Sequence, residues 1–368
     1  MVKNIGVDKF LIVSVIFLLL FGLIMIYNAT MILAKEKYAD SFYFFKKQIL
    51  WVGVGLILFG ILSLLKYPLY LNQKFVFLAL VISIIALIMV FFTGKINNSY
   101  RWIRLGAFSV QPSEFAKISA IMYLSYLFGK KKYDVNNIKK LIVLLIPIFI
   151  IELLILKEPD YGNFFLILLA TLIILFVSGF KIKYFLISSV LIFSLVFVSL
   201  KLSPERMNRI LAYLNPQDYV TTYSFQTMQS IYALGSGGIF GQGLGKSTQK
   251  LYFLPYAYTD FIFSIIGEEV GLIGTLLVLG LFFIFLTRGL RIAKQSGNLH
   301  TYLLGIGLTF LIVSQALINI SVTLGIVPTK GIPLPFISIG GSSMIASLII
   351  AGIIVNISKH RKMVFLND

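Results

Sequence analysis

The chain has 368 residues, of which 58% are hydrophobic and 12% charged, and it contains no cysteine. No soluble core needs so large an apolar share, so the composition indicates a membrane protein. The lack of cysteine excludes disulfides, thiolate metal sites and a cysteine nucleophile, and two histidines argue against a histidine-based triad. The net charge of +18 lies in short segments between apolar runs, which indicates charge facing anionic lipid and no nucleic-acid partner.

Ten apolar runs are long enough to cross a bilayer as helices, because about 20 residues span its hydrocarbon core. We therefore predict an all-α, polytopic integral membrane protein with a single transmembrane domain over residues 1–368. The runs lie near residues 9–33, 48–65, 74–93, 114–129, 139–156, 162–179, 184–201, 261–287, 301–325 and 337–357. Lys and Arg are more frequent on the segments placed inside by this arrangement, so both termini are expected in the cytoplasm.

Three segments expected on the outer side are long or unusual. They are residues 94–113, the proline-rich residues 326–336, and residues 202–260, a large extracytoplasmic loop between the seventh and eighth runs. The inner connections are shorter. Long loops in a compact protein usually carry function, so we expect the functional site at the outer face.

The first polar motif is RWIRLGAFSVQPSEFAK, residues 101–117. Ser113 is expected to cap a helix, with Glu114 in the first turn, where the helix dipole favours negative charge. Lys117 shares a helix face with Glu114, and an ammonium group inside an apolar helix needs a partner within the protein. A structural ion pair and a substrate-binding pair are both compatible with this pattern.

Four further charged residues lie on the outer segments. Arg101 and Arg104 can bind two phosphate oxygens each through a planar guanidinium, or they can reach lipid headgroups. Asp160, in the turn KEPDYG, is either a turn residue or a counter-charge for Lys117 or an outer arginine. Lys330, in the proline-rich loop, is a further candidate to contact phosphate.

The segment GSGGIFGQGLGKS, residues 235–247, resembles a nucleotide-binding loop only in part. That pattern needs glycine where Phe240 stands, and it needs a preceding strand that the sequence does not predict. We interpret the segment as a flexible glycine connection that allows close backbone approach.

Asp260 lies where a polar connection changes to an apolar run, in YAYTDFIFSIIGEEVG. A carboxylate at a cavity mouth can act as the base in sugar transfer, although it can also simply cap the helix. Glu268 and Glu269 follow, the first of them roughly 12 Å further along the helix axis. Two adjacent acids in an apolar helix are costly and are expected to be functional or paired.

Taken in order, these motifs resemble the SEDS family (shape, elongation, division and sporulation), the peptidoglycan glycosyltransferases of the FtsW, RodA and SpoVE type. PTKG and GEEVG place the chain closest to the FtsW and sporulation branch. The matching stretches are RWIRLGAFSVQPSEFAK, EPDYG, MQSIYALGSGGIFGQGLGKS, QKLYFLP, TDFIFSIIGEEVG and PTKGIPLPFISIGGSS.

The resemblance implies a polymerase of lipid II, the disaccharide-peptide on undecaprenyl pyrophosphate, acting in cell division, elongation or sporulation. It places the protein in the bacterial cytoplasmic (inner) membrane, with its active site facing outward among membrane lipid. The implied partner is a class B penicillin-binding protein, a transpeptidase. A divalent cation, Mg²⁺ or Mn²⁺, is expected to help at the pyrophosphate, although no metal cluster is readable.

The resemblance also assigns roles to residues. The catalytic aspartate of the family falls on Asp260. The other functional charged positions of the family fall on Arg101, Glu114, Lys117 and Asp160. We add Arg104 and Lys330, on their chemistry, as candidates to hold the pyrophosphate.

The chain departs from the family where Glu and His are usual, because Tyr256 and Tyr258 stand there instead. This removes two titratable groups beside the presumed base. The two tyrosines keep open a non-catalytic scaffold for the transpeptidase, and a transporter that flips lipid II is a separate alternative to an enzyme. Broken helices at the membrane midplane and inverted repeats would favour the transporter, but the sequence indicates proline breaks only in outer loops.

Overall fold

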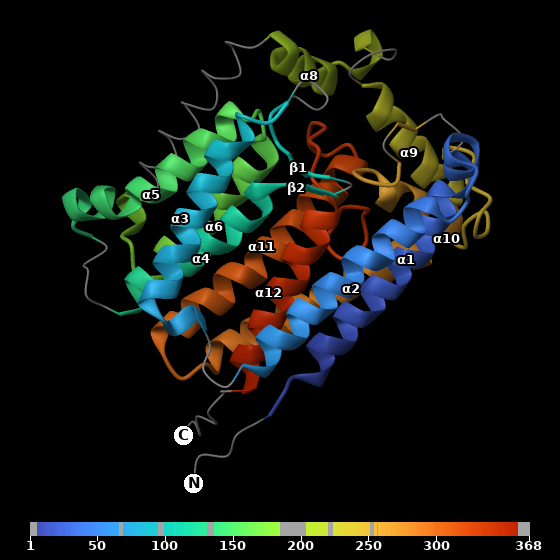
Figure 1. The fold of residues 1–368 in the computed structure, drawn as a ribbon. Helices are drawn as coiled ribbons and strands as arrows, with labels where there is room; N and C mark the ends of the chain where they lie inside the picture. The colour runs from blue at the N-terminus through green and yellow to red at the C-terminus, as the bar shows by residue number, and fades with distance from the viewer. Residues whose placement is uncertain are drawn as a thin grey trace.

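The computed structural model describes residues 6–65, 69–94, 99–106, 108–130, 136–184, 204–219, 224–250, 254–255 and 257–359. Within these residues the fold is a bundle of long helices with one short β-hairpin (Figure 1). Its elements are α1 (Lys9–Tyr38), α2 (Tyr43–Leu64), η1 (Leu69–Leu71), α3 (Gln73–Val90), β1 (Ile103–Leu105), β2 (Phe108–Val110), α4 (Pro112–Gly129), α5 (Ile138–Lys157), α6 (Tyr161–Val177), α8 (Pro204–Leu214), η2 (Pro216–Tyr219), α9 (Phe225–Gly237), α10 (Ile262–Lys294), α11 (Leu299–Thr323) and α12 (Gly341–Lys359).

The predicted all-helical class is confirmed in its main features. A helix lies over each predicted apolar run except the seventh, residues 184–201, which falls almost entirely outside the described residues. Among the described helices, 6 are long and apolar enough to cross a membrane: α1, α2, α3, α10, α11 and α12. The count of ten spans and the membrane placement of residues 202–260 stay predictions. Two details differ, since β1 and β2 pair antiparallel within residues 94–113, and α8 and α9 occupy parts of residues 202–260.

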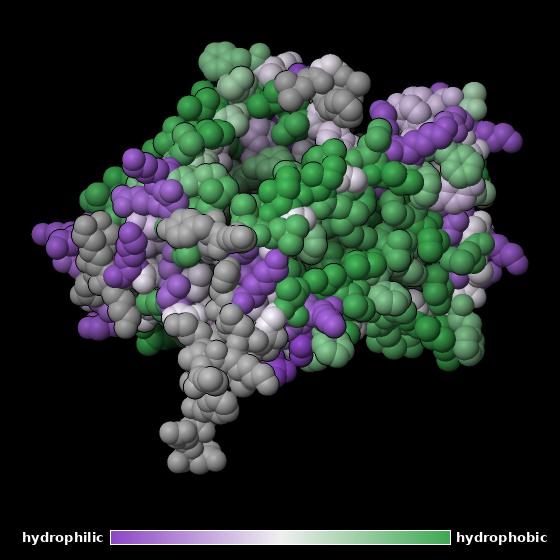
Figure 2. Space-filling model, turned by 60° about the horizontal axis from the view of Figure 1, so that its bottom comes forward, coloured by the Kyte–Doolittle hydropathy of each residue, from purple (hydrophilic) through white to green (hydrophobic). Residues whose placement is uncertain are grey.

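The helices α11 and α12 form the centre of the bundle, and most of their side chains are buried. Helix α2 packs on α12, while α1 and α9 pack on α10; α3, α4, α5 and α6 gather on the other side (Figure 1). Figure 2 shows hydrophobic side chains over a broad area of the surface, with hydrophilic residues gathered towards its edges. Exposed large apolar residues on outer helices, such as Phe17 and Phe283, are what a bilayer would cover.

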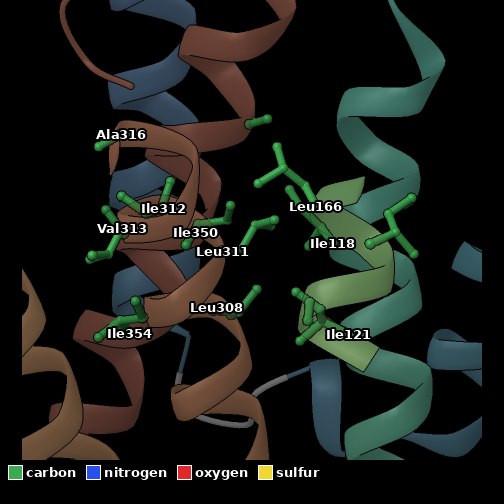
Figure 3. Close-up of a cluster of buried hydrophobic side chains, with 14 of the residues drawn as sticks. Ile118, Ile121, Leu166, Leu308, Leu311, Ile312, Val313, Ala316, Ile350 and Ile354 are labelled. Carbon is green, nitrogen blue, oxygen red and sulfur yellow. The ribbon is translucent and has the colours of Figure 1, made fainter. Parts of the chain in front are cut away.

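A dry apolar layer supports the centre of the bundle (Figure 3). Ile118 of α4 and Leu166 of α6 face Leu311 of α11, and Ile350 of α12 lies beside α11. All four side chains are buried. This layer holds together α4, α6, α11 and α12, and the starts of α4, α6 and α12 contribute to the site described below.

The predicted run 261–287 is correct in position, but it does not form one unbroken helix. Helix α10 is interrupted at Gly271, whose φ of 74° and ψ of −162° are not helical, and it continues to Lys294. The break lies inside an apolar segment and at a glycine, so it is of a kind that the expectation about proline breaks in outer loops did not cover. The start of α1 and the end of α12 lie at the opposite end of the bundle from the start of α10, because Asp8 bonds to both Ser358 and Arg288.

Candidate functional site

Four helices begin close together at the end of the bundle that the sequence predicts to face outward: α4, α6, α10 and α12. Gln111, which precedes α4, joins two of the others. Its backbone N–H donates to Ser342 Oγ of α12 at 2.9 Å, and its side-chain Nε2 donates to Asp160 Oδ2, at the start of α6, at 2.9 Å. Helix N-termini carry partial positive charge and favour anions. We call this region the outer site.

Asp260 lies in the outer site immediately before α10. Phe261 is the N-cap residue of α10 and no side chain caps the helix there, so the capping role considered for Asp260 is wrong. Its carboxylate faces Gly331, since Oδ2 lies 3.3 Å from the position that a Cβ of Gly331 would take. No donor among the described residues bonds this carboxylate, which keeps some exposure. The group is therefore available to a substrate.

The electrostatic surroundings of Asp260 suit a base. Enclosure by protein raises the pKa of its carboxyl to about 7, and the nearby positive charge of Arg101 acts in the opposite direction. A general base works best with a pKa near the working pH, because it must be ionised and still able to take a proton.

The backbone at Asp260 is fixed by the segment between α11 and α12. Asn319 of α11 donates from Nδ2 to the carbonyl oxygens of Asp260, at 2.8 Å, and Ile332, at 2.7 Å. Ser338 Oγ donates to Thr259 O at 2.5 Å, and Ile339 N donates to Tyr258 O at 3.1 Å. The segment 331–340 thus holds residues 258–260 in one position.

Three of the predicted cations, Arg101, Lys330 and Arg104, have different surroundings in the structure. Arg101 is half-buried and donates to the carbonyl oxygens of Glu158, at 3.2 Å, and Pro159. Lys330 is exposed, with Nζ 5.2 Å from the centre of the Phe165 ring and no acidic partner among the described residues. Arg104 lies on β1 opposite Ser109, and its side chain is exposed.

Asp160 is a structural organiser of the outer site. Oδ1 accepts from Asn163 N at 3.3 Å and so caps α6, while Oδ2 accepts from Gln111 Nε2, Ser113 Oγ at 3.2 Å and Asn163 Nδ2 at 2.8 Å. The expected cap by Ser113 is wrong, because α4 begins at Pro112 with Gln111 as its N-cap residue. Pro is well suited to the first helical position, and this leaves Ser113 free to bond Asp160.

Glu114 and Lys117 form a buried pair below the outer site. Lys117 Nζ lies 3.1 Å from Glu114 Oε2 and donates to Gln315 Oε1 of α11 at 3.0 Å. Both charged side chains are at most 3% exposed. Gln315 Nε2 in turn donates to Pro333 O at 3.0 Å. The pair therefore links α4 and α11 to the segment that supports Asp260, and Asp160 is not its counter-charge.

Sequence reasoning missed several polar residues of this region. Gln315 and Asn319 are four residues apart in the apolar α11, and the cost of burying two amides on one face was a usable signal.

Glu158 was missed as well. It is fully buried with no hydrogen bond to either carboxylate oxygen. Burial and the neighbouring Asp160 raise the pKa of Glu158 to about 8, against the effect of Arg101.

The acids Glu268 and Glu269 are paired, as expected. Glu268 Oε1 accepts from Thr248 N at 2.8 Å and from Thr248 Oγ1 at 2.9 Å, and Oε2 accepts from Ser247 Oγ. Glu269 Oε1 lies 2.9 Å from Lys250 Nζ, with both side chains buried. The two carboxylates thus hold the end of the glycine-rich segment against α10.

Replacing Glu268 by Gln is expected to lower the free energy of unfolding by about 1–3 kcal/mol, because a side-chain amide cannot accept from every donor that now faces the carboxylate. Chemical denaturation in micelles would measure the change. The matched control is Glu36→Gln on exposed surface at the end of α1, for which no comparable change is expected. Equal stability of both variants would show that Glu268 does not hold the segment.

Of the two tyrosines that stand where the family usually has Glu and His, the structure describes only Tyr258. Tyr256 lies outside the described residues. Tyr258 stacks on Phe44 with 5.6 Å between ring centres. Its backbone supports Asp260 through Ile339, so at this position the side chain contributes packing.

The described residues do not fit a divalent cation held by the protein. They contain no group of three or more His, Cys, Asp or Glu placed to bind a metal. Asp160, the acid best placed between helices, already accepts from four donors. No step of the chemistry below depends on a protein-bound metal.

Comparison with known proteins gives consistent results. Residues 9–363 match a family model for FtsW, RodA and SpoVE described as "Cell cycle protein". A probable peptidoglycan glycosyltransferase FtsW of Trichlorobacter lovleyi is 38% identical, covering 97% of this chain and 94% of that one. Stage V sporulation protein E of Bacillus subtilis is 37% identical, covering 98% and 99%. A chain of a solved peptidoglycan synthase complex has the same fold, with a TM-score of 0.79, 24% identity and coverage of 96% and 98%.

Proposed function

The chain belongs to the cell cycle protein family of FtsW, RodA and SpoVE, and on this premise we propose that it is a peptidoglycan glycosyltransferase. Its substrate would be lipid II, which it polymerises into glycan strands at the outer face of the bacterial cytoplasmic membrane. The names of its relatives support the reaction class. The residues of the outer site support the details.

One observation carries the proposal. Asp260 presents a carboxylate that no donor in the described part of the chain bonds, with a pKa near neutrality, beside cations and at the start of a helix. Other acids of the region, Asp160 and Glu114, are taken up by hydrogen bonds or an ion pair. A reactive base and an anion-binding surface are the two requirements of sugar transfer from a diphosphate donor.

The proposed reaction is a direct displacement. The acceptor sugar hydroxyl attacks C1 of the donor sugar, and Asp260 takes the hydroxyl proton as the new C1–O bond forms. The bond from C1 to the pyrophosphate breaks, and undecaprenyl pyrophosphate leaves with the electron pair. Arg101 and Lys330 stabilise the negative charge of the leaving group, because neither has an acidic partner among the described residues.

The remaining candidates take supporting roles in this proposal. Asp160 fixes the starts of α4 and α6, and Glu114 with Lys117 fixes the segment below Asp260. Since Glu114 and Lys117 are enclosed, they position the site without touching the sugar. Arg104 is exposed on the hairpin and is proposed to meet the outer part of the substrate or a lipid headgroup. Dependence on Mg²⁺ or Mn²⁺ stays a prediction that chelation with EDTA during the assay tests.

We propose a class B penicillin-binding protein as the partner. The support is the shared fold with a chain of a peptidoglycan synthase complex that coordinates polymerization and crosslinking. Purified protein with such a transpeptidase and lipid II should therefore give glycan strands on a gel, and omission of this chain should give none.

The lipid II transporter is a second candidate because α10 is broken at Gly271. Broken helices occur in transporters near the substrate path. Liposomes with labelled lipid II separate the two functions. Lipid II that moves between leaflets while no polymer forms would overturn the polymerase proposal, and polymer formed from lipid II already on the outer side would support it.

The rate of polymerisation should depend on pH through Asp260. Only the ionised carboxylate accepts a proton, so a pKa of about 7 predicts a rate that rises with pH through neutrality and then levels. Arg101 lowers this pKa, so Arg101→Gln should move the rising limb to higher pH. Arg101→Lys keeps the charge and should leave the limb near its original position.

Initial rates measured over about two pH units on either side of neutrality give the position of this limb for each variant. Glu158→Gln is the matched control, because its carboxyl also titrates nearby and Arg101 acts on it. A limb that disappears in Glu158→Gln but is unchanged in Arg101→Gln would contradict the assignment to Asp260.

A further inference from the structure

The break in α10 is filled by an earlier part of the chain, residues 237–245, which we call the glycine turn. In an unbroken helix, Leu272 N and Ile273 N would donate to the carbonyl oxygens of Glu268 and Glu269. Here Leu272 N donates to Gly238 O at 2.9 Å, and Ile273 N donates to Ile239 O at 3.3 Å. The freed carbonyl oxygens of Glu268 and Glu269 accept from Gln242 N at 2.9 Å and Gly243 N at 3.0 Å. The turn therefore supplies partners for the donors and acceptors of both helical hydrogen bonds that the break removes.

Glycine makes this close approach possible. A Cβ on Gly241 would lie 2.2 Å from Glu269 O, and one on Gly271 would lie 2.4 Å from both Gly241 N and Ile239 O. Both glycines also have positive φ, at 76° and 74°. The interpretation of the segment as a site of close backbone approach is thus supported, whereas its role as a mere connection is not.

The depth of the break follows from the charges of α10. Arg288 marks the inner end of its apolar part, and it pairs with Asp8 at the start of α1. A hydrocarbon core of about 30 Å needs about 20 residues at a rise of ~1.5 Å, which reaches from Thr287 to about Glu268. Gly271 therefore lies inside the hydrocarbon, and so does the turn that bonds to Leu272 and Ile273.

The neighbouring α1 supports this depth. It packs against α10, and its sequence from Phe10 to Ala34 has no charged residue. At ~1.5 Å per residue this apolar length is about 37 Å. Figure 1 shows the gold-coloured segment after α9 at the periphery, beside the outer ends of α1 and α10. The bilayer that covers α1 thus extends past the level of the break.

Three of the exposed side chains of the glycine turn are apolar, and the fourth is the amide of Gln242, whose Nε2 donates to Ser236 O at 3.4 Å. Ile239 is 60% exposed, Phe240 is 80% exposed and Leu244 is 60% exposed. They adjoin Leu272 and Ile273, which are about half exposed on the lipid-facing side of α10. Residues 225–245 contain no charged side chain. In water such an apolar surface is costly, whereas acyl chains would cover it at no cost.

Irregular backbone inside a bilayer is tolerated only where its polar groups are bonded within the protein. The four hydrogen bonds to α10, with two more from Gly241 N to Gly237 O at 2.8 Å and from Lys246 N to Gly243 O at 3.1 Å, bond a large part of the backbone of the glycine turn within the protein. We propose that residues 237–245 form a re-entrant turn in the outer leaflet, with Ile239, Phe240 and Leu244 in contact with lipid acyl chains. The large loop then returns to the membrane before Asp260 and is anchored there.

A single-cysteine experiment tests this proposal, because the chain has no cysteine of its own. Phe240→Cys and Leu244→Cys are each labelled with the environment-sensitive dye NBD in full-length protein in nanodiscs. Leu276→Cys, on the exposed face of α10, is the lipid-facing control, and Lys246→Cys, exposed just after the turn, is the water-facing control. Elution as a single folded species on gel filtration is required of every variant.

NBD attached at positions 240 and 244 is expected to have an emission maximum close to that at position 276, and at a shorter wavelength than that at position 246. Doxyl-labelled phosphatidylcholine should quench it strongly and aqueous iodide weakly, with the opposite pattern at position 246. Strong quenching by iodide at 240 and 244 would overturn the proposal by placing the turn in water. Protection from both quenchers would also overturn it, because the occupant would then be protein. Neither outcome depends on catalytic activity.

Discussion

Lys117→Met is expected to lower the free energy of unfolding by about 3–5 kcal/mol, because it leaves a charge buried without its partner. Lys117 is 2% exposed, and its ammonium is shared between Glu114 and Gln315. Methionine fills a similar volume, so packing is largely kept. The loss would fall on Glu114, whose carboxylate would stay enclosed at the start of α4.

Chemical denaturation in micelles measures this loss, and two further variants make it specific. Lys46→Met removes an exposed ion pair with Asp40 and should change the free energy of unfolding far less than Lys117→Met does. Adding Glu114→Gln to Lys117→Met removes the unpaired charge and should restore part of the stability. If Lys117→Met were as stable as the unmodified protein, the buried pair would not be structural.

Asp260→Asn is expected to lower the rate of glycan polymerisation by about 10²–10⁴-fold, the usual contribution of a general base. Asparagine has nearly the same shape but does not take up a proton at neutral pH. Stability should change little, because no protein donor among the described residues bonds the carboxylate and the backbone contacts to Asn319 and Ile332 remain. The rate of strand formation from lipid II on a gel measures the effect.

The fold was largely predictable because each long apolar run in a membrane protein has to become a helix. Such runs predicted α1, α2, α3, α11 and α12 with errors only at their ends. Hydropathy does not locate helix ends precisely, because prolines, glycines and capping residues determine them. This explains the errors at the end of α6 and at the starts of α4 and α12. The hairpin of β1 and β2 could not be predicted, because it consists of two strands of 3 residues each.

The break in α10 could not be predicted from its own residues. Residues 262–287 carry no charged side chain except Glu268 and Glu269, and a single glycine such as Gly271 is common in membrane helices. The donors and acceptors that make the break tolerable come from Gly238 to Gly243, some thirty residues earlier in the chain. Only tertiary structure brings them together.

Several charged residues of the candidate site gave signals in the sequence, whereas Glu158 and the neutral residues were missed. The change from polar to apolar sequence at Asp260, and the cost of Lys117 inside a helix, gave clear signals. Gln111 and Asn319 gave weak ones, because amides occur in many roles. Their hydrogen bonds decide which acids are engaged and which remain free, as the contrast between Asp160 and Asp260 shows.

The most direct test of the central claim compares binding with turnover for Asp260→Asn. Purified protein with its transpeptidase partner is given labelled lipid II, and bound lipid II and glycan strands are measured on the same sample. Asp40→Asn, an outer acid paired with Lys46, is the control that should leave both unchanged. We predict that Asp260→Asn binds lipid II as the unmodified protein does and makes almost no polymer. Normal polymer from Asp260→Asn would contradict the account.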